Sequence, residues 1–133
     1  MPATTTALSD LSDALAAAVE KAGASTVLVN ARRRFPASGI IWSADGVIVT
    51  SDHVIERDDD ITVTLADGRE LNATIAGRDP GSDIAVLKVE GSGLTPAERS
   101  AEGTAHVGNI VLALGRPTTD GPMASFGVIG SLG

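Results

Sequence analysis

Short apolar segments separated by turn residues run through the sequence from Thr26 onward, and this pattern constrains the fold more than any other feature. Asp45-Gly46 and Asp67-Gly68 each stand between two such segments, a position typical of a β-hairpin turn. The apolar segments cover residues 27–29, 40–42, 47–49, 61–65, 71–75, 84–89, 106–114 and 124–132. Short strands of this kind, with turns about every 8 to 12 residues, predict an all-β sandwich or small barrel. No long helix alternates with the strands, so the pattern argues against a parallel α/β sheet.

The segment before Thr26 instead has the spacing of apolar residues that is typical of a helix. Its larger apolar side chains recur at steps of three and four residues and include Leu8, Leu11, Leu15 and Val19. This spacing predicts a helix over residues 7–22, with Gly23 as a stop. The apolar stripe is narrow because alanine is frequent, so we expect a helix docked on something larger.

Composition excludes several classes of function. With 10 Lys and Arg against 17 Asp and Glu, the net charge of -7 argues against a nucleic-acid or anionic-membrane partner. The chain has no Cys, which removes disulfides, thiolate metal sites and a cysteine nucleophile. No signal-peptide pattern is visible at the N-terminus, and no apolar run reaches the roughly 20 residues of a membrane span. The low aromatic count predicts a core of Val, Ile, Leu and Ala.

Two residues occupy positions where catalytic groups are often found, although neither residue alone indicates catalysis. His53 is one of only two histidines and follows the predicted strand at 47–49, where a loop begins. Asp83 directly precedes the strand at 84–89, a position that a turn or capping residue commonly takes. A lone histidine is more often a surface residue than a catalytic one.

Other polar clusters are weaker candidates. The basic run 32–34 is best explained as the solvated end of an edge strand, and the acidic run 58–60 lacks the spaced oxygens of a calcium loop. His106 has no second ligand in a metal-like pattern, so we expect it at a strand edge. Trp42 is expected to pack in the core or between elements.

Taken together, His53, Asp83 and their surroundings resemble a known family. Seven segments carry the likeness, in order: 38–41 (SGII), 45–50 (DGVIVT), 53–55 (HVI), 61–69 (ITVTLADGR), 83–89 (DIAVLKV), 107–115 (VGNIVLALG) and 127–133 (GVIGSLG). They resemble the first half of the protease domain of HtrA-type, DegP-like serine proteases, a bacterial branch of the trypsin-like enzymes. The resemblance covers roughly residues 36 to 133.

The resemblance implies a fold of antiparallel six-stranded Greek-key barrels, two in the complete domain, with the active site between them. It makes His53 the catalytic histidine and Asp83 the catalytic aspartate, with no metal and no cofactor. The implied activity is hydrolysis of peptide bonds in polypeptide substrates. The family commonly works outside the cytoplasm, often in the periplasm, and its N-terminal segments often take part in subunit contacts, so a homo-oligomer is expected. The compartment itself is not readable from this sequence.

The catalytic serine of such a triad is not in the sequence. The nucleophile should follow Asp83 in a Gly-x-Ser-Gly-Gly context, and none of the later serines has that context: Ser92, Ser100, Ser125 and Ser131. We therefore expect these 133 residues to be inactive in isolation. The expected division is a helical segment at 1–24, a first barrel at 25–115, and a linker with the first strand of a second barrel at 116–133.

Two questions stay open at this level. The acidic Asp52 precedes His53, where the family usually has a neutral residue, and it is either turned away from the imidazole or a competitor of Asp83. The alternative to a protease fragment is a non-catalytic β-barrel that serves as a binding or interaction module. Retention of both His53 and Asp83 favours the protease.

Overall fold

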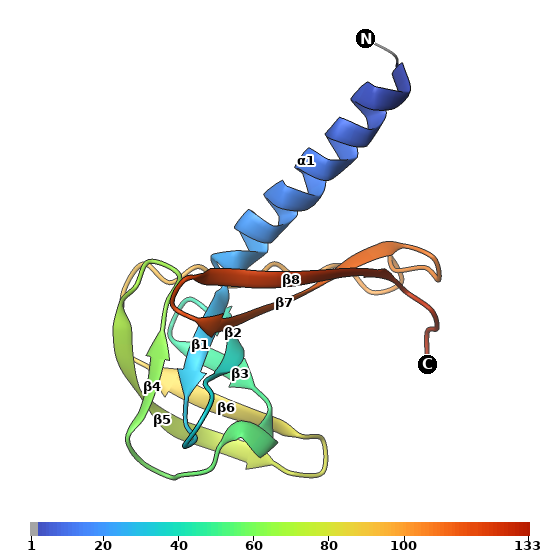
Figure 1. The fold of residues 1–133 in the computed structure, drawn as a ribbon. Coiled ribbons are helices and arrows are strands. Elements are labelled where there is room, and N and C mark those ends of the chain that lie inside the picture. Colours follow the sequence, from blue (N-terminus) through green and yellow to red (C-terminus); the bar gives the residue numbers. More distant parts are fainter. Residues whose placement is uncertain (1–2) are drawn as a thin grey trace.

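The computed structural model describes residues 3–133, with side chains from residue 6 onward. Six antiparallel strands form a closed barrel in the order β1-β2-β3-β6-β5-β4 (Figure 1). Their bounds are β1 Thr26–Asn30, β2 Ala37–Ser43, β3 Val47–Thr50, β4 Ile61–Thr64, β5 Glu70–Asp79 and β6 Ile84–Val89. The prediction of a six-stranded antiparallel barrel with an N-terminal helix is confirmed.

Aliphatic side chains fill the barrel, as the composition predicts. The largest fully buried side chains are Ile41, Ile48, Ile61, Leu87, Val27, Val29, Val63 and Val89. They alternate along their strands with outward-facing residues, which is the period-two pattern that a barrel wall requires. Irregular pairing interrupts β2 between Ile41 and Ser43 and β5 between Ile75 and Gly77. Such bulges let strands bend around a small barrel.

The turn between β2 and β3 presses closely on the end of β6. Gly46 adopts a φ of 104°, and its carbonyl accepts a 2.9 Å hydrogen bond from the N–H of Val89. A Cβ atom on Gly46 would lie 2.0 Å from the Val89 carbonyl oxygen. The predicted Asp-Gly turn therefore needs glycine for its backbone conformation and also for the space it leaves to β6.

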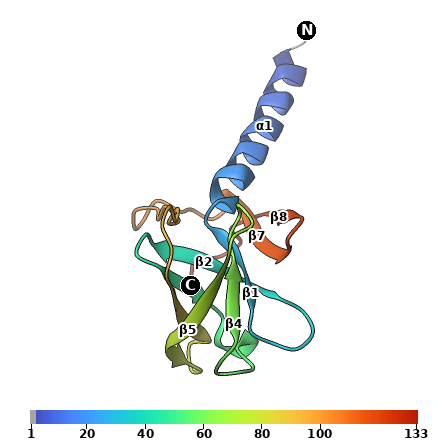
Figure 2. The same cartoon turned by 90° about the vertical axis from the view of Figure 1, so that its left-hand side faces the viewer.

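The helix α1, Ala3–Gly23, is longer than the predicted 7–22 and does not lie along the barrel. Figures 1 and 2 show it projecting away from the strands, with only its C-terminal end at the barrel. Leu8 and Leu11 are exposed, at 64% and 43%. The expectation of a helix docked along a larger body is wrong for this chain, because the stripe packs only near Leu15 and Val19, which are half-buried. Among the described residues, no helix has both the length and the apolar character needed to cross a membrane.

A separate hairpin follows the barrel. It consists of β7, Ile110–Thr118, and β8, Gly121–Val128, which pair only with each other among the described strands. The sequence predicted a strand at 106–114 as part of the barrel. In the structure this strand, β7, begins later, at Ile110, and continues past Pro117. It lies outside the barrel because β4 already pairs with β1 and closes the circle. The pairing shifts between Gly115 and Thr118, so the strand tolerates Pro117.

Arg116 connects this hairpin to the barrel and to α1 through hydrogen bonds. Its side chain is buried, and its guanidinium donates hydrogen bonds to the carbonyls of Thr26 at 2.8 Å and Gly23 at 2.9 Å. Its backbone N–H donates to the Ser38 hydroxyl at 2.7 Å. The cation thus satisfies the Gly23 carbonyl at the C-terminal end of α1, where the helix dipole favours positive charge, and the Thr26 carbonyl at the start of β1.

Candidate active site

Strand pairing brings the two candidate residues together. β3 pairs with β6 in a register that places Thr50 opposite Ala85. His53 follows Thr50 on a single turn of 3-10 helix, η1 (Asp52–Val54), and Asp83 lies two residues before Ala85. The backbone N–H of Asp52 donates to the Asp83 carbonyl at 3.1 Å, which joins the two loops directly. Residues 30 positions apart in the chain therefore meet at one end of the barrel.

The Asp83 carboxylate binds His53 through both of its oxygens. Oδ1 accepts the backbone N–H of His53 at 2.9 Å, and Oδ2 lies 2.7 Å from the imidazole Nδ1. Asp83 has a φ of 57°, a conformation that Asp tolerates better than most residues. With this backbone conformation the carboxylate faces the turn that carries His53.

This geometry determines what the imidazole can do. An ionised carboxylate can only accept hydrogen bonds, so Nδ1 carries the hydrogen and Nε2 is left with its lone pair. The His53 side chain is 67% exposed, so the ring can be reached by a reacting group. No serine of the described residues hydrogen-bonds to His53. An open depression of about 300 Å³ beside the pair is lined by Ser51, Asp83, Ile84 and Leu114 among others.

The same contacts lower the pKa of Asp83 below its ordinary value. The backbone N–H of His53 is the main cause, followed by the imidazole hydrogen bond, while burial acts in the opposite direction. A carboxyl group with a depressed pKa stabilises the fold fully above its ordinary pKa, and this stabilisation is lost as the pH falls below that value.

We therefore expect Asp83→Asn to flatten the acid side of the stability profile. The free energy of unfolding of the wild-type chain should fall more steeply below pH about 4 than that of the variant, because Asn cannot take up the proton. Urea unfolding between pH 7 and pH 3 measures both profiles. The pKa values of Asp45 and Asp67 are lowered in both proteins, so their contribution cancels in the difference. Profiles that stay parallel down to pH 3 would contradict this account of the pair.

Asp52, the acid beside His53, is turned away from the imidazole. Its side chain is only 10% exposed, and its Oδ1 accepts a 2.6 Å hydrogen bond from Nε of Arg78. Of the two alternatives that the sequence leaves open, the structure selects the first. Arg78 was not among the residues predicted from the sequence, although the acid at position 52 was a sign that a cation lies nearby.

The remaining candidates do not assemble into a site. His106 lies in the turn before β7, where its N–H donates to Asn109 Oδ1 at 2.8 Å. Asp60 ends the acidic run in a tight turn with a φ of 53°, and the described residues hold no cluster of His, Asp and Glu suited to a metal. Trp42 packs at the surface, 42% exposed, with the Arg99 guanidinium 4.3 Å from its ring centre. Arg33 and Arg34 lie exposed in the β1–β2 loop, so the predicted solvation holds. The predicted edge strand is wrong, because β1 pairs with both β2 and β4 in the closed barrel.

Comparison with known proteins decides the family. A family model described as a trypsin-like peptidase domain matches residues 37–133. The chain belongs to the trypsin-like peptidase family. It is 40% identical over 96 residues to the serine endoprotease DegS of Haemophilus influenzae, which covers 72% of this chain and 28% of that protein. It is 42% identical over 96 residues to a probable periplasmic DegP-like serine endoprotease of Ectopseudomonas mendocina, covering 72% of this chain and 20% of that one.

A solved structure agrees with this trypsin-like assignment. The crystal structure of a serine endoprotease from Yersinia pestis superposes with a TM-score of 0.79 and 35% identity, over 87% of this chain and 44% of that one. The resemblance to HtrA-type, DegP-like proteases is thereby confirmed. The chain spans less than a third of the curated relatives named above and less than half of this structure.

Proposed function

We propose that this chain contributes the histidine and the aspartate of an HtrA-type serine endopeptidase site, with His53 as general base and acid and Asp83 as its orienting carboxylate. The observation that carries the proposal is the 2.7 Å contact between His53 Nδ1 and Asp83 Oδ2, together with an exposed ring. The family and the names of the relatives supply the reaction type.

The chemistry follows from the tautomer that Asp83 selects. Nε2 of His53 accepts the proton of a serine hydroxyl while the serine oxygen attacks the carbonyl carbon of the scissile peptide bond. The same proton then passes to the amide nitrogen as the carbon–nitrogen bond breaks and the amine leaves. Asp83 stabilises the imidazolium that exists between these two transfers. A water molecule repeats the cycle on the acyl-enzyme, which releases the new carboxylate.

The serine and the oxyanion hole of this site lie outside these 133 residues in our proposal. After Asp83 the sequence has no Gly-x-Ser-Gly-Gly segment, and residues 116–133, which include β8, are proposed to begin the second barrel that carries it. The polypeptide substrates and the extracytoplasmic setting, which the relatives' names suggest, are part of the same proposal.

The isolated chain is therefore expected not to react with a fluorophosphonate probe, which labels activated serines. Incubation with the probe followed by intact-mass spectrometry checks this, with a complete relative such as the Yersinia pestis endoprotease as a positive control. Stoichiometric labelling of any of the four serines after Asp83 would contradict the proposed division of the site. A reading frame that ends naturally at Gly133 would favour the alternative, a non-catalytic interaction module.

The hairpin supports a second part of the proposal, that the isolated chain self-associates. Several of its apolar side chains are exposed, namely Ile110, Val111, Met123, Phe126 and Val128. Exposed apolar surface next to a strand with a free edge commonly recruits another chain. We expect a dimer or a larger assembly by light scattering at tens of micromolar. A monomer at that concentration would show that the hairpin stays solvated.

A further inference from the structure

Arg78 reaches from the barrel wall to the turn that carries His53. It lies near the end of β5, and its guanidinium contacts three acceptors on that turn. Nε donates to Asp52 Oδ1 at 2.6 Å, and Nη2 donates to the carbonyls of Asp52 at 3.3 Å and Ile55 at 3.2 Å. One planar guanidinium thus hydrogen-bonds to residues before and after His53. The fixed arrangement of its N–H donors allows this geometry, which the single ammonium group of lysine does not reproduce.

The strand that carries Arg78 also helps to determine the position of Asp83. In the β5–β6 ladder Arg78 lies opposite Ala85 and Asp79 opposite Ile84, so β5 fixes the strand that begins immediately after Asp83. Arg78 therefore connects the two elements whose separation sets the distance between His53 Nδ1 and Asp83 Oδ2. A small displacement of the turn would lengthen both of the bonds that Asp83 makes to His53.

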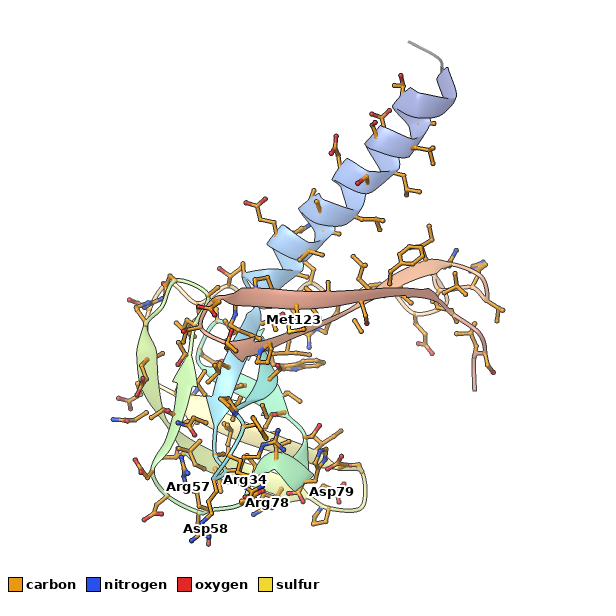
Figure 3. All side chains as sticks on the ribbon, in the orientation of Figure 1. Arg34, Arg57, Asp58, Arg78, Asp79 and Met123 are labelled. Carbon is orange, nitrogen blue, oxygen red and sulfur yellow. The ribbon has the colours of Figure 1, made fainter. Side chains whose placement is uncertain are left out.

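The charges around Arg78 agree with this arrangement. Asp52 is nearly buried and needs a cation, and Asp58, whose side chain is 94% exposed, lies 3.9 Å from Nη1 on the outer side. Figure 3 shows Arg78 and Asp58 at the lower end of the barrel, where Arg34, Arg57 and Asp79 also lie. The hydrogen bond to Asp52 raises the pKa of Arg78 above its ordinary value, so the cation is present at every working pH.

We propose that Arg78 is a positioning residue for the His53–Asp83 pair: it engages Asp52 and holds the 52–55 turn where the imidazole faces Asp83. The inference rests on the proposed function for the role of His53, but the contact that it explains exists in the isolated chain. Arg78 touches no reacting group. It acts through the backbone of Asp52 and Ile55 and by keeping the carboxylate of Asp52 away from the ring.

The test measures the tautomer of His53 in the full 133-residue chain. Long-range ¹H–¹⁵N correlation spectra above the imidazole titration separate the Nδ1–H from the Nε2–H form, and with only two histidines the spectrum is simple. The wild-type chain is expected to hold His53 mainly as Nδ1–H, because Asp83 accepts that hydrogen. His106, whose ring lies in the turn before β7, is the internal reference.

The decisive variant is Asp52→Asn/Arg78→Met, which removes the ion pair without changing the net charge. Replacing both partners leaves no unpaired charge, so the fold should survive. The ratio of Nδ1–H to Nε2–H at His53 is expected to fall about fivefold, the ratio that corresponds to one hydrogen bond of ordinary strength. Arg78→Lys, which keeps the charge beside Asp52, should retain a ratio between those of the wild type and the double variant. Arg57→Met is the matched control, since among the described residues Arg57 donates hydrogen bonds to Asn30 and the Asp60 carbonyl, at the same end of the barrel, and not to the 52–55 turn.

The outcomes separate the two proposals. A folded double variant with the wild-type tautomer ratio, whatever its stability, would overturn the positioning role and leave the proposed function standing. A wild-type chain in which His53 is mainly Nε2–H would instead contradict the pair itself, and with it the proposed function. An equal fall in Arg57→Met would show that loss of any nearby cation suffices, which also overturns the specific role of Arg78.

Discussion

Replacing His53 by Ala is expected to lower kcat/KM on the order of 10⁴-fold or more in a joined chain that supplies the missing serine. The joined chain consists of residues 1–133 followed by the part of the Yersinia pestis endoprotease that comes after the matched region. His53→Ala removes the imidazole that is proposed to take the serine proton and return it to the leaving amine. Asp83→Asn should cost about 10⁴-fold, because the amide no longer selects the Nδ1–H tautomer.

Peptide hydrolysis by the joined chain and its variants measures this effect. His106→Ala is the matched control, because within the described part of the chain the ring of His106 has a hydrogen-bond contact of 3.2 Å to the Thr104 carbonyl and none to His53 or Asp83. It should stay within a few-fold of the parent. Comparable losses in His53→Ala and His106→Ala would mean that histidine removal harms the fold, and the assignment of His53 would lose its support.

The largest effect on stability is expected from Gly46→Ala. The added methyl group would sit 2.0 Å from the Val89 carbonyl oxygen, and the φ of 104° is unfavourable for any residue with a Cβ. Strain and overpacking together should cost about 3 to 5 kcal/mol, a large part of the total stability of a small domain. The backbone hydrogen bond from Val89 to Gly46 would be lost or displaced, which opens the barrel where β2, β3 and β6 meet.

Gly68→Ala provides a matched control for Gly46→Ala. Gly68 occupies the equivalent Asp-Gly turn between β4 and β5 with a φ of 91°, but no atom lies within 4 Å of its virtual Cβ. The free energy of unfolding of Gly68→Ala should fall only by the cost of the backbone conformation, about 1 to 2 kcal/mol. Urea unfolding of both variants separates the two terms. Equal losses would show that the close approach to Val89 relaxes without cost.

The barrel was predictable because its signals are local. Alternation of apolar residues predicts which side of each strand is buried, and Asp45-Gly46 and Asp67-Gly68 predict the turns between them. These features depend on neighbours within a few positions. The position of His53 at the end of one strand and of Asp83 at the start of another is equally local, and the family resemblance was needed to connect them.

The features that were missed depend on distant contacts. In the sequence, the alternation of apolar and polar residues ends at Ile75. Because the pairing is irregular between Ile75 and Gly77, the sequence pattern does not indicate that β5 continues to Asp79. Arg78 was therefore not placed on a strand, and its bond to Asp52, 26 positions away, could not be inferred. The extension of β7 through Arg116 likewise depends on carbonyls near Gly23 and Thr26. The direction of α1 depends on contacts of its C-terminal end with β1, β7 and β8, and the last two strands are distant in the sequence (Figure 1).

Fluorophosphonate labelling of the joined chain tests most directly the claim that His53 and Asp83 form half of a protease site. We predict one label per chain, on a serine of the appended part, with no label on residues 1–133 and labelling lost in His53→Ala. Circular dichroism of the same samples shows whether the joined chain is folded. A folded joined chain that remains unlabelled, or one that labels equally well without His53, would contradict the account.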